Sequence, residues 1–334
     1  MQDRDYDVGH FPGELVMDDF NHDGKLDLVV ANYWDHNVTV LIGDGTGRFL
    51  KKLNHNSFEV GGRTRQMVTG DFNGDGHLDL ITVNDTNGDL SFVSGNGDGE
   101  FGAPRLFSAG GRALSVAVLD FNGDHRLDLA VGIQTVNTVR ELFGDGAGGF
   151  ITHGGIDVGN NPGAIISSDF NLDGKADLAV VNSDDNDIYA LLGDGTGLIQ
   201  AANRYSMGQF PVAILATDFN RDGKPDILTA NLNSADVSLL LNAIVISPQK
   251  SLYQLIKYVE QLNLPHGIEN ALTRKLENAI TRIENGRTNA AIMHLYAFIC
   301  QVEAQRGKKI TESDADYLVG EVQAIIHRIQ SVPD

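Results

Sequence analysis

Up to about residue 242 the hydrophobic positions come in short runs that are separated by glycine, asparagine and aspartate. Typical runs span residues 26–31, 78–83 and 176–181, and partner runs at 38–42 and 90–93 follow one loop later. Each run has the length and the polar boundaries of a β-strand. No helical pattern alternates with these runs, which excludes a parallel α/β sheet. The pattern predicts a mainly β domain built from consecutive short strands.

These runs belong to an internal repeat. The string Asp-Phe-Asn begins five times, at steps of 52, 49, 49 and 49 residues, at Asp19, Asp71, Asp120, Asp169 and Asp218. A glycine stands ten residues before each of these aspartates, and a bulky apolar residue stands thirteen before. Four strands in about 49 residues are typical of one propeller blade. The sequence therefore predicts a five-bladed β-propeller.

The two ends of the repeat array complement each other. The fifth repeat has Asn242 where the others begin a glycine-rich turn, so it lacks its fourth strand. The segment Asp5 to Gly9 has the pattern of a fourth strand without the first three. We expect the two pieces to complete one blade and join the ends of the ring. A chain cut from a longer array would begin in the same way, and this alternative stays open.

The composition changes near residue 243, where glycine becomes rare and a helical periodicity begins. Ser247 and Pro248 have the pattern of a cap and a first helical position, Pro265 opens a second helix, and Thr311 begins a capping box. Four amphipathic helices in about 85 residues predict a small bundle. We divide the chain into a propeller, residues 1–245, and a helical domain, residues 246–334.

Each repeat carries an acidic loop with oxygen-bearing side chains at positions 1, 3, 5 and 9, and position 7 offers its backbone carbonyl. Calcium takes six to eight oxygen ligands, and such a loop aims alternate oxygens at one point. The sequence therefore predicts about five structural Ca²⁺ ions. The candidate ligands are Asp19, Asn21, Asp23, Lys25 and Asp27; Asp71, Asn73, Asp75, His77 and Asp79; Asp120, Asn122, Asp124, Arg126 and Asp128; Asp169, Asn171, Asp173, Lys175 and Asp177; and Asp218, Asn220, Asp222, Lys224 and Asp226.

Position 6 is glycine in four loops, where a left-handed backbone is needed for the turn. The third loop has His125 there, and we expect its site to be the weakest or its loop to be distorted. An EF-hand would require Glu at position 12 followed by a helix, whereas position 12 here lies inside a predicted strand. Solvated acidic turns would not keep the same offsets five times.

The repeat columns resemble the FG-GAP or VCBS repeats of integrin α-subunit propellers and fungal propeller lectins, over residues 1–245. The resemblance implies a calcium ion between the first and second strands of each blade, on one face of the disc. It also implies that ligands meet the opposite face or the grooves between blades. Most such relatives have seven blades. The stretches 298–302 and 307–311 resemble the FIMAH module found at the ends of secreted bacterial proteins.

Charge and cysteine content narrow the functional class. The net charge is −20, with 45 acidic and 25 basic residues, which argues against a nucleic-acid partner. The single cysteine, Cys300, excludes an intrachain disulfide, and we expect it to be buried in a helix. The sequence contains no run of about 18 apolar residues, so no membrane span is predicted. The chain start is polar and has no secretory signal, as in a secreted protein written without one or in a cytosolic protein.

Two groups of residues are candidates for a ligand site on the face opposite the calcium loops. Tyr33, Trp34 and His36 follow the second strand of the first repeat, where aromatic faces beside polar groups suit a sugar. The arginines Arg63, Arg65 and Arg112 could hold a carboxylated or sulfated glycan. The structural alternatives are that Trp34 packs between blades and that the arginines form salt bridges at the rim.

We therefore predict a calcium-stabilised, secreted or cell-surface binding or adhesion protein whose ligand is a glycan or a surface protein. The alternative is a carbohydrate-active enzyme, a glycoside hydrolase or polysaccharide lyase, which needs two carboxylates flanking one bond. Glu14 is the one acid in its inner-strand column; the other members are Gln66, Ser115, Ala164 and Ala213. No Ser/His/Asp or Cys/His set recurs, so no catalytic residue is assigned. No pattern specifies an oligomer.

Overall fold

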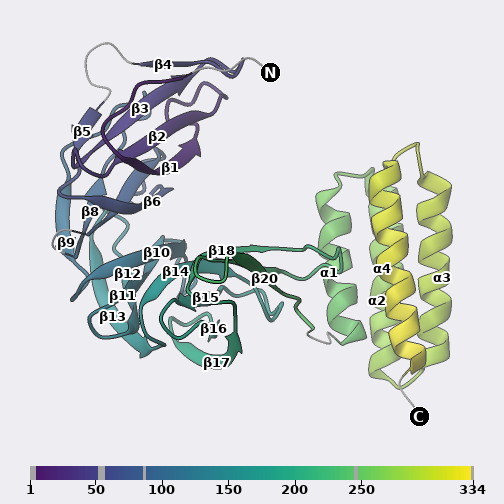
Figure 1. Cartoon of the computed structure of the whole chain (residues 1–334). Coiled ribbons are helices and arrows are strands. Elements are labelled where there is room, and N and C mark those ends of the chain that lie inside the picture. Colours follow the sequence, from purple (N-terminus) through teal and green to yellow (C-terminus); the bar gives the residue numbers. More distant parts are fainter. Residues whose placement is uncertain (1–4, 52–56, 86–87, 244–246, 332–334) are drawn as a thin grey trace. The chain divides into compact units, whose positions relative to one another are not determined.

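The computed structural model describes residues 5–51, 57–85, 88–243 and 247–331. The chain forms two compact units, Met1–Asn242 and Ala243–Asp334. The first is a five-bladed β-propeller, and the second contains four helices (Figure 1). The boundary lies three residues before the predicted one at 245/246, and the first helix begins at Pro248. The fold class predicted from the repeat is confirmed.

Each blade is an antiparallel sheet whose strands follow the chain order. Blade 1 contains β1 (Pro12–Asp18), β2 (Asp27–Asn32) and β3 (Asn37–Gly43), with an outer edge in two pieces, β4 (Phe49–Lys51) and β5 (Ser57–Glu59). Blade 2 contains β6 (Thr64–Gly70), β7 (Asp79–Asn84), β8 (Asp89–Val93) and β9 (Arg105–Ser108). Blade 3 contains β10 (Ala113–Leu119), β11 (Asp128–Ile133), β12 (Thr138–Gly144) and β13 (Phe150–Asp157).

Blade 4 contains β14 (Pro162–Ser168), β15 (Asp177–Asn182), β16 (Asp187–Gly193) and β17 (Ile199–Ser206), and blade 5 contains β18 (Pro211–Thr217), β19 (Asp226–Asn231) and β20 (Asp236–Leu240). The inner strands β1, β6, β10, β14 and β18 pack against one another in this order. The second strands of blades 2, 3 and 4 are buried along their whole length. This explains why their sequences are apolar runs and do not alternate.

Ring closure is not described by the structure. Within the described residues, blade 5 has three strands, and Asp5 to Gly9 forms none. This segment lies against blade 1, where Tyr6 contacts the ring of Phe49 and Gly9 donates to the Asn32 side chain. The expectation that it completes the last blade stays a prediction.

The second unit is an antiparallel helix bundle. Its helices are α1 (Pro248–Gln261), α2 (His266–Glu284), α3 (Thr288–Gln305) and α4 (Glu312–Ser331). The predicted caps are present: Ser247 accepts from the Lys250 N–H, and Thr311 accepts from Asp314 at 3.1 Å. The core is built around Phe298, which is fully buried. None of the described helices is both long and apolar enough to cross a bilayer.

The expected burial of Cys300 is wrong, because the residue is exposed on α3. Leu295, Phe298 and Val302 carry the buried stripe of this helix. Cys300 follows Phe298 by two positions, which puts it on the other side of a helix with 3.6 residues per turn. Cysteine is usually buried, but the phase of this helix places Cys300 on its exposed side.

Candidate functional site

The five acidic loops all connect the first and second strands of a blade, so they share one end of the strands. In the first loop Asp19 accepts hydrogen bonds from the backbone N–H groups of Asp23 and Gly24, at 3.1 and 2.8 Å. Asn21 accepts from Asp23, and Asp23 accepts from Lys25. These hydrogen bonds curl the loop into consecutive tight turns.

The aspartate at position 9 has a second task in every blade. Asp27 is fully buried and accepts from the N–H groups of Phe20 and Gly43, at 3.1 and 2.8 Å. Corresponding pairs of backbone donors reach Asp79, Asp128 and Asp226, and Asp177 accepts from the N–H groups of Asn171 and Gly193. Burial raises the pKa of Asp79 and Asp177 to about 6, with a smaller upward contribution from the other aspartates of each loop. A bound cation would counter this cost, because it favours the ionised carboxylate.

Each loop offers three carboxylates, one amide oxygen and one backbone carbonyl, and an all-oxygen set of this kind suits calcium. Within the described chain, however, no three acidic or histidine side chains converge closely enough to enclose an ion as they stand. The donor chemistry fits calcium, and the side chains would have to turn inward to bind it.

The third loop is not distorted. His125 has φ 66° at position 6, and its N–H reaches Asp120 at 2.9 Å, as the Gly24 N–H reaches Asp19 at 2.8 Å. His125 therefore takes the backbone shape of glycine at the cost of strain. A left-handed backbone at loop position 4 was not predicted from the sequence, yet His22, Leu172 and Arg221 have positive φ there.

The two predicted ligand-site groups meet at the junction of blades 1 and 2. The guanidinium of Arg63 lies 4.4 Å from the centroid of the Trp34 ring and 5.7 Å from that of Tyr33. Trp34 is 52% exposed, so it is not packed between two blades as the structural alternative required. Tyr33 donates its hydroxyl to Asp85 at 2.8 Å, which connects the cluster to blade 2.

Arg112 extends the cluster to blade 3. It donates Nε to Asp85 at 3.0 Å, also binds that carboxylate through Nη2, and reaches Gln134 at 2.6 Å. Partial burial acts to raise the pKa of Asp85, but the hydrogen bonds from Arg112 and Tyr33 outweigh it and hold this pKa below the ordinary value. Arg112 thus forms a salt bridge at the rim, which was the structural alternative to a ligand contact.

Phe11 completes this surface and was missed by the sequence reasoning. Its ring lies 6.0 Å from that of Trp34 and 5.9 Å from that of Tyr33, and it is 63% exposed. Its φ of 54° recurs at the same repeat position in Asn161 and Phe210, so the left-handed backbone belongs to the turn of the repeat. We call Phe11, Tyr33, Trp34, Arg63, Asp85 and Arg112 the aromatic–arginine surface. No described contact brings His36 into it, and Arg65 is an exposed neighbour on β6.

The family of the chain follows from its repeats. A family model of the FG-GAP-like repeat matches residues 19–82, 71–131 and 169–229, more than half of the sequence. The chain belongs to the FG-GAP-like repeat family. The matched regions of this FG-GAP protein begin at the first aspartate of an acidic loop, as the repeat columns predicted. A second model, the FIMAH domain, matches residues 250–327 and covers the four helices.

Solved structures agree with the FG-GAP fold. A functionally unknown protein from Desulfotomaculum acetoxidans is 17% identical, with a TM-score of 0.50, and the match covers 70% of each chain. A putative 6-phosphogluconolactonase from Bacteroides uniformis is 12% identical, also with a TM-score of 0.50, over 70% of this chain and 72% of the other. At these identities the likeness shows the fold alone. No curated protein matches the sequence.

Proposed function

We propose that this FG-GAP protein is an extracellular binding module that is stabilised by about five calcium ions and recognises a glycan on its aromatic–arginine surface. The observation that carries the ligand site is the half-exposed Trp34, with Arg63 stacked on it and the exposed Phe11 beside it. Two exposed rings next to a guanidinium give a sugar both apolar contact and hydrogen-bond donors.

Charge supports the calcium part of the proposal. The five loops contribute fifteen carboxylates to a chain with a net charge of −20, and five Ca²⁺ ions would reduce that charge to about −10. Without a cation these carboxylates repel one another, and the position-9 aspartates lie buried. We expect affinities of about 10⁻⁴–10⁻³ M, as in extracellular modules, which would leave the sites empty in cytosol. This range favours secretion or the cell surface.

The same surface suits a glycan that carries a carboxylate or sulfate. A guanidinium that stacks on a ring keeps its N–H groups in its own plane, where they can bind an anion. Arg63 and Arg65 place positive charge next to the Asp85–Arg112 pair on an acidic protein. That contrast would attract an anionic ligand and orient it.

A glycan array with and without calcium tests the proposal. We expect binding to neutral or acidic polysaccharides that is lost in chelator and in Trp34→Ala. The matched control is Tyr253→Ala, which removes an aromatic side chain of similar exposure, 54%, from the helical unit. Binding that Trp34→Ala leaves unchanged would contradict the assigned surface. Cleavage of a polysaccharide would favour the enzyme alternative, and binding to a surface protein alone would exclude a glycan as the ligand.

A further inference from the structure

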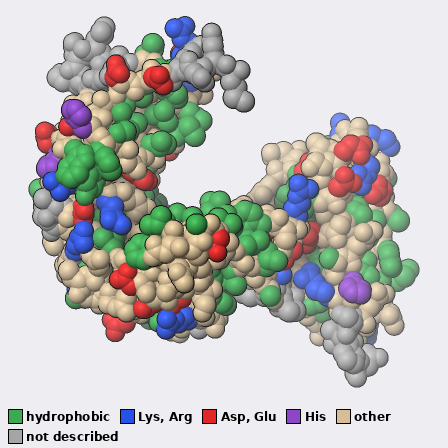
Figure 2. Space-filling model, viewed as in Figure 1, with side chains coloured by type: hydrophobic (Ala, Val, Ile, Leu, Met, Phe, Trp, Pro, Cys, Tyr) green, Lys and Arg blue, Asp and Glu red, His purple; other side chains and the backbone are tan. Residues whose placement is uncertain are grey.

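Two histidines from neighbouring blades meet at the junction of blades 1 and 2, on the end that carries the acidic loops. His22 is position 4 of the first loop, and His77 is position 7 of the second. Their ring nitrogens, Nε2 of His22 and Nδ1 of His77, lie 3.1 Å apart, and the ring centroids lie 5.3 Å apart. Histidine side chains are visible on the propeller surface in the region of these two blades (Figure 2). Two imidazole groups from different blades thus share one hydrogen bond.

The pair is specific to this junction. At the three junctions that follow along the chain, the residue at position 4 of one loop and the residue at position 7 of the next are Gly74 and Arg126; Gly123 and Lys175; and Leu172 and Lys224. Glycine and leucine have no side-chain ligand atom, and arginine and lysine are cationic at neutral pH and offer no lone pair. Of these four junctions, the first therefore is the one that brings two metal-ligating side chains to these positions.

Neither imidazole belongs to the predicted calcium set. That set uses the side chains at positions 1, 3, 5 and 9 and the backbone carbonyl at position 7, so it leaves the rings of His22 and His77 out. The His77 ring lies on the glycine turn of its own blade, because a Cβ atom at Gly97 would come within 2.3 Å of Nδ1. His22 is exposed and His77 is half-buried, so an ion can reach the pair from solvent.

The distance between the two nitrogens fits a shared metal ion. Zinc binds imidazole nitrogen at about 2.0–2.1 Å. Two nitrogens that are 3.1 Å apart both reach this distance when the angle at the metal is about 98°, which lies between the octahedral and the tetrahedral value. In the structure the nitrogens share a proton instead. An ion between them displaces that proton to the other nitrogen of the same ring, and each ring turns its lone pair toward the metal.

Imidazole nitrogen also selects the kind of ion. Zinc, copper and nickel take histidine readily, whereas calcium takes oxygen ligands, so the pair and the acidic loops suit different ions. Within the described chain no third histidine, cysteine or acidic side chain converges on the pair, and water would therefore complete the coordination. The carboxylates of the two loops add a negative potential that attracts a cation to this place.

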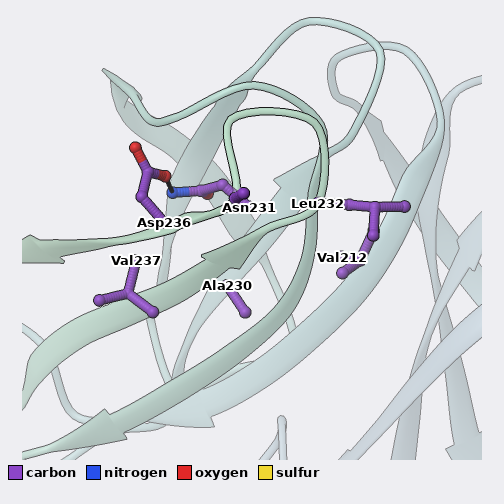
Figure 3. A pocket seen from close by; sticks show the side chains of 7 residues that line it. Val212, Ala230, Asn231, Leu232, Asp236 and Val237 are labelled. Atoms are coloured by element: carbon purple, nitrogen blue, oxygen red, sulfur yellow. Dashed lines mark hydrogen bonds between the residues drawn. The ribbon is translucent and has the colours of Figure 1, made fainter.

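The depression on blade 5 offers no comparable ligand set. Val212, Leu232 and Val237 give it a mainly apolar lining (Figure 3). Asp236 is the one acidic residue among those that line it, and its carboxylate accepts a hydrogen bond from the amide of Asn231. A cation that left water for this surface would find one carboxylate to replace its hydration shell, and the histidine pair is the better place for a metal.

We propose that His22 and His77 bind one divalent transition-metal ion of the zinc type, which bridges blades 1 and 2. The two histidines are 55 positions apart in the sequence, so the unfolded chain does not hold them together, and the ion stabilises the folded state. The same two blades carry the stack of Arg63 on Trp34, and the ion fastens the junction that this stack spans. The site depends on neither calcium nor a glycan.

Calorimetric titration with Zn²⁺ tests the site. The protein carries Cys300→Ser, because its exposed thiol is also a zinc ligand, and excess Ca²⁺ occupies the acidic loops. We expect His22→Asn and His77→Lys each to weaken one binding event by at least about tenfold. Asparagine tolerates the left-handed backbone of His22, and lysine is the residue that three other loops have at position 7. His125→Asn is the matched control, because it removes a histidine from another acidic loop, and it should leave the titration unchanged.

Electron paramagnetic resonance with Cu²⁺ as the probe counts the ligands directly. We expect coupling to two imidazole nitrogens in the parent protein and to one in His22→Asn or His77→Lys. A single nitrogen in the parent protein, or an effect of only one of the two substitutions, would overturn the bridge between blades. Zinc binding that is absent, that survives both substitutions, or that appears only without Ca²⁺ would overturn the site altogether. These readouts need no glycan, so failure of the proposed ligand surface would not affect them.

Discussion

Asp79 accepts a hydrogen bond from the backbone N–H of Gly95 at 2.9 Å, and its other carboxylate oxygen accepts one from Phe72 at 3.0 Å. Phe72 belongs to the acidic loop, and Gly95 opens the hairpin turn after the third strand. One buried carboxylate therefore joins two turns that lie at the same end of the blade. The position-9 aspartates thus support the blade directly, whether or not a cation is bound.

Asp79→Asn should separate this structural role from metal binding. An amide has one acceptor oxygen, so a backbone donor would face its NH₂ group, and we expect a loss of about 1–3 kcal/mol in unfolding free energy. Urea unfolding in excess chelator measures the loss without any contribution from calcium. Asp184→Asn is the control, because Asp184 is exposed in a loop. Similar losses for the two variants would contradict the assigned role.

The raised pKa values predict an unusual pH dependence. Burial raises the pKa of Asp79 and Asp177 from 3.8 to about 6, so between these values the folded state binds more protons than the unfolded state. Their stabilising contribution is complete below pH 3.8 and is lost as the pH rises through about 6. In chelator, raising the pH from 5 to 7 should therefore lower the melting temperature, by about 2 °C or more.

Calcium should reverse this trend, because the ion requires ionised carboxylates and binds more tightly as they lose protons. Melting curves at pH 5, 6 and 7, each with calcium and with chelator, provide the measurement. The double variant Asp79→Asn, Asp177→Asn is the control and should lose much of the pH effect in chelator. An identical pH trend with and without calcium would contradict metal binding at these loops.

The repeat allowed most of the fold to be predicted. Because every blade uses the same backbone turns, five copies of one column identify strands that a single copy would leave ambiguous. The helix caps at Ser247 and Thr311 were predictable because a capping bond depends on residues only three positions apart. The exposure of Cys300 could not be predicted from its residue type, because it depends on the phase of the helix.

The ligand surface was predictable only in pieces. Trp34 and Arg63 were candidates for separate reasons, and only the packing of blade 1 on blade 2 stacks them. Phe11 and Asp85 carried no signal in the sequence, because their importance depends on neighbours that lie 22 to 52 residues away. The left-handed residues at loop position 4 were missed for a different reason: Leu172 and Arg221 are residue types that do not predict positive φ.

His125→Gly should stabilise the third loop. The histidine holds φ 66° with the same hydrogen bond that glycine makes elsewhere, so the change removes strain and leaves the bond in place. We expect a gain of up to about 1 kcal/mol, and a tighter weakest site in a calcium titration. The reverse change in blade 4, Gly174→His, is the matched partner and should cost a similar amount. If neither the stability nor the weakest calcium affinity responds to His125→Gly, the strain argument fails.

Arg63→Lys tests the stack on Trp34 without requiring the ligand. Lysine keeps the charge but loses the planar group that covers the indole, and such a contact contributes about 0.5–1 kcal/mol at exposed sites. Trp34 is the sole tryptophan, so the intrinsic fluorescence of the protein reports on this site alone. We expect a red shift of the emission as water reaches the uncovered face of the ring. Arg112→Lys is the control, because Arg112 pairs with Asp85 and Gln134, and the emission should stay in place. Equal shifts in both variants, or none in Arg63→Lys, would mean that the stack does not persist in solution, and the assignment of the aromatic–arginine surface would lose its main support.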